Sequence, residues 1–194
     1  GISDHGNNHG AFDFYKTAKS AGVKPIIGIE AYLSPGTARQ DRTRVRWGNG
    51  GDVDGDVSGG GAYTHMTVLA ENNQGLGNLF KLSSLASLEG YYYKPRMDRE
   101  LLSKYADGLI ATTGCPGGEI QTRLRMGKYK EALRAASDYR DIFGAQNFYL
   151  ELMDHQLDIE ARVQADLMKL GKDLKLPLLA TNDLHYTQKE DAAA

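Results

Sequence analysis

The chain has 194 residues, of which 41% are hydrophobic and 25% are charged, and its formal net charge is −2. These values are ordinary for one globular domain with a sizeable core, and they exclude a polycation that binds nucleic acid through bulk charge. No apolar run approaches the length of a membrane span, and no signal peptide is visible. The single cysteine, Cys115, excludes an intramolecular disulfide framework and suits a cytoplasmic protein.

Apolar spacing predicts strands and helices in alternation along the chain. Strands are predicted at the first residues and at 25–33, 63–72, 108–118 (where the strand runs into a glycine-rich turn), 147–155 and 176–186. Helices are predicted at 8–21, 75–90, 98–105, 119–143 (one helix or two) and 157–174. The segment 36–61, rich in Gly, Asp and Arg and without periodicity, is predicted to be a long mobile loop.

This order of elements predicts an α/β fold with a mainly parallel sheet. The stretches PIIGI, GLIA and LPLLA are nearly continuous apolar runs, as expected for strands that are covered on both faces. We expect a single domain over residues 1–194. The chain opens on GISDH without an initiator Met and closes on EDAAA, which resembles the first turn of a helix, so we expect a part of a longer protein.

Side chains suited to metal binding or acid/base chemistry accompany nearly every predicted strand, mostly where it ends. In a barrel of parallel strands the carboxyl ends share one face, so residues far apart in the sequence converge there. Histidine, cysteine and carboxylate together are typical of zinc or of a mixed divalent cluster. Ligands spread one or two per strand indicate a multi-metal catalytic centre. The residues concerned are His5, Glu30, His65, Cys115, Asp154, His155, Asp183 and His185.

Each residue also has an ordinary structural explanation. A histidine at a strand end is more often a hydrogen-bonded loop residue than a ligand, and a lone cysteine is usually a small core residue. Glu30 could form an ion pair, and Asp183 could cap a helix that starts after Tyr186. The coincidence of these candidate residues on successive strands favours the metal centre over the separate structural explanations.

Seven short motifs follow one another along the chain, in the order SDHG, KPIIGIEAY, YTHMTVLAEN, NLFKLSS, TTGCPGGE, ELMDH and ATNDLHY. They resemble the polymerase-and-histidinol-phosphatase (PHP) domain at the N-terminus of bacterial replicative DNA polymerase III alpha subunits. The stretches WGNGGDVDGDVSGGGAYTH and TGCPGGEIQTRLRMG are most similar to actinobacterial versions.

The resemblance implies a distorted (β/α) barrel of seven strands with up to three divalent metals, zinc or manganese. The ligands that it implies are His5, Glu30, His65, Cys115, Asp183 and His185. Asp154 and His155 would support the ligands or contact substrate, with structural packing as the alternative, and His9 is expected on a helix surface. The family's opening His-x-His and the Asp after it should precede Gly1 and have no counterpart here, so the first strand is expected to be missing.

The chemistry that the resemblance implies is metal-dependent phosphodiester hydrolysis, in the form of 3′→5′ exonuclease proofreading beside a DNA-directed DNA polymerase. Glu30, Asp183 and His185 would be the catalytic residues. Arg123 and Arg125 could contact the phosphate backbone, or could lie on a solvated helix face. Tyr91, Tyr92 and Tyr93 could stack on an unpaired terminal base, or form a partly buried loop cluster.

The implied partners are DNA, as the single-stranded 3′ end of a primer, the other polymerase domains, and replisome subunits such as the sliding clamp; no membrane is implied. Two other functions remain open. The domain could be a non-catalytic structural module that braces the polymerase and binds a proofreading subunit, or a small-molecule phosphoesterase similar to histidinol phosphatase. The chain lacks the paired-aspartate pattern of a polymerase palm, so DNA synthesis itself is not expected here.

Overall fold

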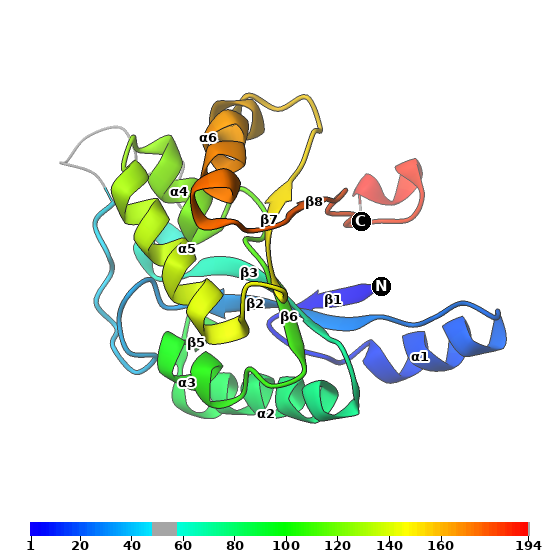
Figure 1. Ribbon diagram of the computed structural model, residues 1–194. Helices are drawn as coiled ribbons and strands as arrows, with labels where there is room; N and C mark the ends of the chain where they lie inside the picture. The colour runs from blue at the N-terminus through cyan, green and yellow to red at the C-terminus, as the bar shows by residue number, and fades with distance from the viewer. Residues whose placement is uncertain (48–57, 194) are drawn as a thin grey trace.

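The computed structural model describes residues 1–47 and 58–193, which form a curved sheet surrounded by helices (Figure 1). The sheet of the described residues has eight strands in the order β4-β5-β2-β3-β6-β7-β8, and β1 pairs with β2 beside β5. The strands are β1 (Ile2–His5), β2 (Ile27–Leu33), β3 (Thr64–Ala70), β4 (Tyr91–Tyr92), β5 (Lys94–Met97), β6 (Leu109–Thr112), β7 (Phe148–Leu152) and β8 (Leu178–Ala180).

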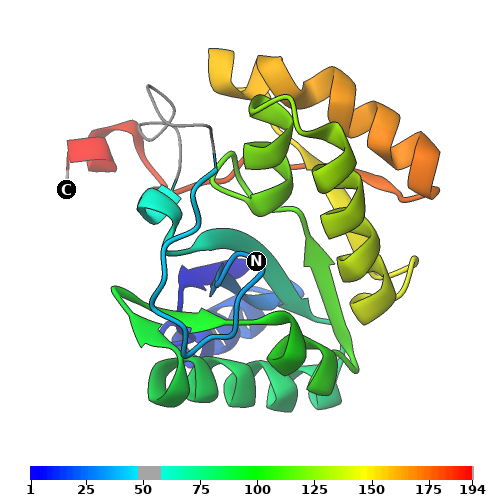
Figure 2. The same ribbon diagram turned by 90° about the vertical axis from the view of Figure 1, so that its left-hand side faces the viewer.

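The helices follow the predicted alternation and cover the outside of the sheet (Figures 1 and 2). α1 and α2 pack on the half built from β2, β3 and β5, whereas α5 and α6 pack on β6 and β7. The predicted helix at 119–143 is two helices, because the chain turns at Gly127 with a positive φ of 68°. The helices are α1 (Ala11–Ser20), α2 (Asn73–Glu89), α3 (Arg99–Lys104), α4 (Glu119–Arg125), α5 (Tyr129–Phe143) and α6 (Asp158–Leu174), with 3-10 turns at Ser58–Gly61 and Lys189–Ala193.

The direction of β3 differs from that of its neighbours. β3 runs antiparallel to both β2 and β6, whereas β1 with β2, β2 with β5, β6 with β7 and β7 with β8 are parallel pairs. The start of β3 therefore lies at the same edge of the sheet as the carboxyl ends of β2 and β6. This reversal matters for the candidate site, because His65 lies at the start of its strand.

The α/β class and the barrel-like arrangement predicted from the sequence are confirmed, but the sheet of the described residues is not closed. β8 pairs only with β7, and β1 pairs only with β2. β8 has three residues, and shortly after it Asp183 adopts a left-handed φ of 42° that ends the extended backbone. The open edges of β1 and β8 are therefore separated.

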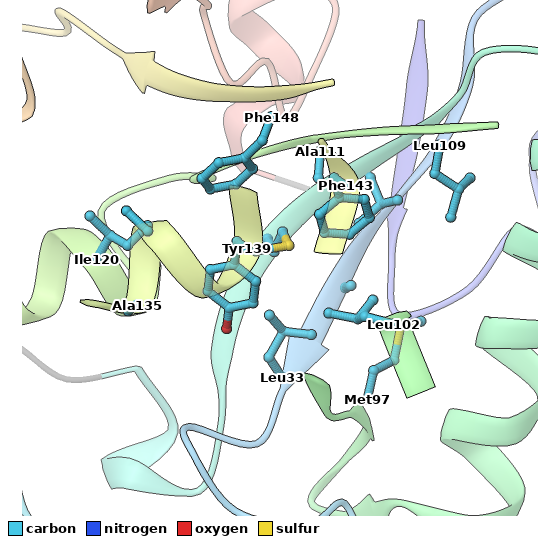
Figure 3. Close-up of a cluster of buried hydrophobic side chains, with 14 of the residues drawn as sticks. Leu33, Met97, Leu102, Leu109, Ala111, Ile120, Ala135, Tyr139, Phe143 and Phe148 are labelled. Carbon is cyan, nitrogen blue, oxygen red and sulfur yellow. The ribbon is translucent and has the colours of Figure 1, made fainter. Parts of the chain in front are cut away.

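The core lies between the sheet and the helices. Phe148 on β7 contacts Tyr139 and Phe143 on α5, with ring centroids 5.9 and 6.4 Å apart (Figure 3). Leu79 and Leu82 of α2 are fully buried on the other side of the molecule. Each large apolar side chain buried in this way contributes roughly 1.5–3 kcal/mol to stability.

The described part of the predicted loop at 36–61 is attached to the fold by a buried arginine. The Arg96 guanidinium on β5 donates hydrogen bonds to the carbonyls of Arg39 and Asp41, both at 2.7 Å, and to the Ala62 carbonyl at 3.0 Å. Trp47 is also buried. The mobility expected for this loop falls partly on residues 48–57, which lie outside the described residues.

Two glycines of α2 give a test of the packing between this helix and the loop before β6. A Cβ at Gly75 would lie 1.7 Å from the Gly108 carbonyl oxygen, whereas a Cβ at Gly77 would meet nothing within 4 Å. Gly77→Ala should therefore stabilise the protein by roughly 0.5–1 kcal/mol, and Gly75→Ala should destabilise it by about 1–3 kcal/mol despite the same gain in helix propensity. Urea unfolding of both variants measures the difference, and equal shifts would contradict the packing described here.

Candidate metal centre

The sheet places three of the candidate ligands on neighbouring strands. In the register of β1 with β2, His5 lies opposite Glu30, and in the register of β2 with β3, Tyr32 lies opposite His65. Glu30 and Tyr32 are two residues apart on one strand and share a face of the sheet. Glu30 and His65 are therefore diagonal neighbours on that face, close enough for their side chains to meet.

Glu30 is the hub of the cluster. Its carboxylate is buried, with 7% of the residue exposed. One oxygen lies 2.8 Å from Nδ1 of His65, and the other lies 3.2 Å from Nδ1 of His5. Each carboxylate oxygen therefore faces a different imidazole.

Cys115 reaches the same point from a tight turn after β6. The main-chain N–H of His65 donates to the Gly117 carbonyl at 3.1 Å, and the N–H of Gly118 donates to the Cys115 carbonyl at 2.8 Å. A Cβ at Gly118 would lie 2.3 Å from the Thr113 carbonyl oxygen, so the turn requires glycine there. The turn holds the Cys115 Sγ 3.4 Å from His65 Nδ1 and 3.8 Å from a Glu30 oxygen.

The charges of this cluster act on each other. Burial alone would raise the pKa of Glu30, but the hydrogen bond from His65 and the charges of the three nearby histidines outweigh it and lower that pKa. Burial, followed by the negative charge of Glu30, raises the pKa of the Cys115 thiol to about 12. Without a cation beside it, Cys115 is a protonated thiol at neutral pH.

Asp183 and His185 approach the cluster from the segment after β8. They line an open pocket together with His5 and Glu30, and the ring centroids of His185 and His5 lie 5.5 Å apart. Burial, followed by the negative charge of Glu30, raises the pKa of Asp183. The structure thus brings all six predicted ligands to one edge of the sheet.

The donor atoms fit a borderline divalent cation. Single ligand atoms of Glu30, His65 and Cys115 all lie within 4.8 Å of one another. Carboxylate oxygen, imidazole nitrogen and thiolate sulfur are the donors that zinc accepts, and a cation would offset the repulsion between the carboxylates of Glu30 and Asp183.

His155 connects the loop before α6 with the loop that carries Asp183. Its Nδ1 lies 2.6 Å from a carboxylate oxygen of Glu160, and its Nε2 lies 2.7 Å from the Asn182 carbonyl oxygen. The main-chain N–H of His155 donates to the other Glu160 oxygen at 2.7 Å. His155 therefore supports the backbone beside a candidate ligand, while Asp154 accepts a hydrogen bond from the main-chain N–H of Gln156.

The two arginines predicted as phosphate contacts are engaged within the protein. Arg123 lies 2.8 Å from a carboxylate oxygen of the buried Glu119 and 2.6 Å from one of Glu131. Arg125 donates to the Pro116 carbonyl at 2.6 Å and so braces the turn that carries Cys115. Arg123 has its charge balanced by these carboxylates.

Two contributors to the site were not predicted from the sequence. The ring of Tyr32 lies 5.2 Å from that of His65 and 6.4 Å from that of His5, centroid to centroid, so it packs behind both imidazoles. The buried carboxylate of Glu151 accepts hydrogen bonds from Thr112 and Thr181, which join β6 to the segment after β8. Glu151 could have been found from the sequence, because an acid inside the apolar run FYLEL is unusual. Tyr32 could not, because a tyrosine in a buried strand looks like an ordinary core residue.

A parallel-rich α/β sheet with histidine, cysteine and carboxylate gathered at one edge is typical of proteins that bind divalent metals. The chain belongs to the PHP domain family, which matches residues 1–155. Asp183 and His185 lie beyond that match. None of the helices in the described part of the chain has both the length and the hydrophobicity that a membrane span requires.

Over nearly its whole length the chain is similar to three proteins named DNA polymerase III subunit alpha. The one from Saccharopolyspora erythraea is 60% identical over 99% of this chain and 17% of that protein. The one from Mycobacterium leprae is 56% identical over 98% of this chain and 16% of that protein. The one from Mycobacterium tuberculosis is 55% identical over 99% of this chain and 16% of that protein. The chain thus spans about a sixth of the length of these relatives. The resemblance predicted from the motifs, including its actinobacterial character, is confirmed.

The His155–Glu160 pair predicts a pH-dependent contribution to stability. The hydrogen bond with Glu160, followed by that with the Asn182 carbonyl, raises the pKa of His155 above its ordinary value of 6.5. The stabilisation that protonated His155 gives to the folded state is therefore fully present below pH 6.5 and is lost as the pH rises through the folded-state pKa of His155. The stability gap between the wild type and His155→Ala, measured by urea unfolding from pH 5.5 to 9, should narrow across that range.

Glu160→Gln provides the matched background, because it removes the carboxylate whose hydrogen bond is the largest cause of this shift. In the Glu160→Gln background, the difference in the free energy of unfolding caused by His155→Ala should vary less with pH. A gap that is constant with pH in the wild type, or that varies equally in both backgrounds, would contradict the assignment.

Proposed function

We propose that this chain is the PHP domain of a bacterial DNA polymerase III alpha subunit, and that it holds divalent metals and hydrolyses phosphodiester bonds at the 3′ end of a DNA strand. The family match and the similarity to alpha subunits support the first part of this proposal. The convergence of oxygen, nitrogen and sulfur donors on Glu30 supports the second. The setting would be the bacterial cytoplasm, with DNA, the polymerase domains and replisome subunits such as the sliding clamp as partners.

The residues that would hold metal are His5, Glu30, His65, Cys115, Asp183 and His185. When bound, zinc or manganese, up to three ions in all, would activate water and stabilise the charge that develops on the phosphate. Glu30 lies between two imidazoles, and its carboxylate would hold a cation beside them. Cys115 must lose its proton to bind, and Asp183, which lines the same pocket as Glu30, would add a second carboxylate to the site.

The other residues would orient these ligands. The ring of Tyr32 packs against His65 and His5 and restricts their rotation. His155 fixes the backbone of Asn182, and Arg125 fixes the turn of Cys115. Such outer partners typically account for a 10- to 100-fold effect on metal affinity or activity.

Substitution of Asp183 tests the catalytic proposal. In the full-length gene product, Asp183→Asn removes a carboxylate charge with little change of shape. We expect it to slow release of nucleotides from the 3′ end of single-stranded DNA by more than the roughly 10- to 100-fold cost of losing an outer partner. Gel analysis of labelled oligonucleotides with manganese or zinc measures this rate.

Asp13→Asn is the matched control, because Asp13 is an exposed acid on α1. It should leave the rate unchanged, and both variants should retain the DNA synthesis of the wild type. If Asp183→Asn left hydrolysis untouched while the protein still bound metal, the catalytic proposal would be wrong and a structural module would be favoured.

Proton release tests the metal ligands without any assay of activity. Because the pKa of the Cys115 thiol is raised to about 12, its coordination as a thiolate must release a proton at neutral pH. Zinc affinity should therefore rise with pH. Cys115→Ser should release about one proton fewer on binding and bind zinc at least about 10-fold more weakly.

Isothermal titration in buffers of different ionisation enthalpy measures both quantities. Cys115 is the only cysteine of the printed sequence, so within this chain the variant isolates one thiol. Equal proton release by the wild type and Cys115→Ser would show that the thiol is not a ligand.

A further inference from the structure

The strands β4 and β5 form a small hairpin that presents tyrosines to solvent. Tyr91 pairs with Pro95 and Tyr92 with Lys94, so Tyr93 forms the tip of the turn. Tyr93 has a φ of 62°, in the left-handed region that bulky residues rarely adopt. Tyr91 is 63% exposed and Tyr93 is 59% exposed. Tyr93 thus keeps a strained backbone conformation at an exposed tip, and such strain is concentrated at ligand-binding sites.

Cations lie beside these rings. The guanidinium of Arg44 lies over the ring of Tyr93, 5.0 Å from its centroid, and Lys94 is exposed next to it in the sequence. Within the described residues, no carboxylate forms an ion pair with Arg44 or Lys94. Figure 2 shows the hairpin beside the chain segment that contains Arg44. The surface thus combines exposed aromatic rings with positive charges that no carboxylate of the described residues pairs.

The same surface is continuous with the candidate metal centre. The Lys94 ammonium lies 5.5 Å from the centroid of Tyr32. The Tyr32 ring in turn packs against His65 and His5. A strand whose scissile phosphate lay at the histidines would therefore pass Lys94 and reach the tyrosines within a short distance.

We propose that Tyr91, Tyr93, Arg44 and Lys94 bind the unpaired end of a DNA strand and guide it to the metal centre; this inference rests on the proposed function and names where its substrate lies. Bases stack on exposed aromatic faces whatever their sequence, and neighbouring arginine and lysine side chains contact the phosphates. The chain as a whole carries a net charge of −2, so a nucleic acid must be bound by such a local surface.

Photocrosslinking in the full-length gene product tests this surface. The probe is a primer–template whose primer ends in an unpaired thymidine tail that contains 4-thiothymidine, bound in the presence of a chelator so that no hydrolysis occurs. We expect a crosslink to the tryptic peptide 82–96, which contains the three tyrosines. A double variant, Tyr91→Ser with Tyr93→Asn, keeps a residue that tolerates the left-handed φ at position 93, and should reduce the yield at least about fivefold.

Arg44→Gln should also reduce the yield. Matched controls are Tyr15→Ser and Arg134→Gln, which alter a half-exposed tyrosine on α1 and an exposed arginine on α5 and should leave it unchanged. Absence of the crosslink, or a yield that survives the tyrosine and arginine variants, would overturn the inference. A tyrosine variant that crosslinks normally but weakens association with another protein would also overturn it, because the hairpin would then face a protein.

The outcomes for this surface and for the proposed function are separable. The crosslink is measured without metal, so it can be present in a protein that does not hydrolyse DNA. Hydrolysis that depends on Asp183, together with a missing crosslink, would leave the function standing and reject the surface.

Discussion

The site depends on one buried carboxylate and on the imidazoles that balance it. Burying an isolated carboxylate costs several kcal/mol, so Glu30 can occupy its position in β2 only with partners on both oxygens. His65 and His5 provide them, at 2.8 and 3.2 Å. These contacts hold the donor atoms of Glu30, His65 and His5 close together. The protein therefore keeps a preorganised cluster at the sheet edge.

Two features of the backbone make that cluster possible. The antiparallel direction of β3 brings His65, at the start of its strand, to the edge where the other strands end. The glycine turn after β6 then folds back against β3, and Gly118 forms a bridge with His65 itself. Because this turn has no room for a Cβ at Gly118, the position of Cys115 depends on a residue with no side chain. Arg125 fixes the turn from the other side.

Much of this arrangement could be predicted from the sequence, because strand ends carry their own signals. Glu30 and Asp183 stand in or after continuous apolar runs, where a charged residue is unexpected unless it has a partner. The direction of β3 could not be predicted, since periodicity identifies a strand but not its orientation. The ion pair of Arg123 with Glu119 could not be predicted either, because two opposite charges four residues apart on α4 look like a solvated helical pair. The open edge between β1 and β8 is a property of pairing over long distances, which no local pattern contains.

The remaining question is whether such a cluster is needed in a domain that only braces a larger protein. A scaffold gains most from apolar packing, and a buried acid whose pKa is raised weakens it at neutral pH unless a ligand compensates. Here burial, followed by the charge of Glu30, raises the pKa of both Asp183 and Cys115, and for the Asp183 carboxylate this is a cost at neutral pH. The buried ion pairs of Glu119 differ, because two arginines satisfy them within the protein. Glu119 has two arginines beside it, whereas Asp183 shares its pocket with the like charge of Glu30, and this contrast is the physical reason to look for metal beside Glu30.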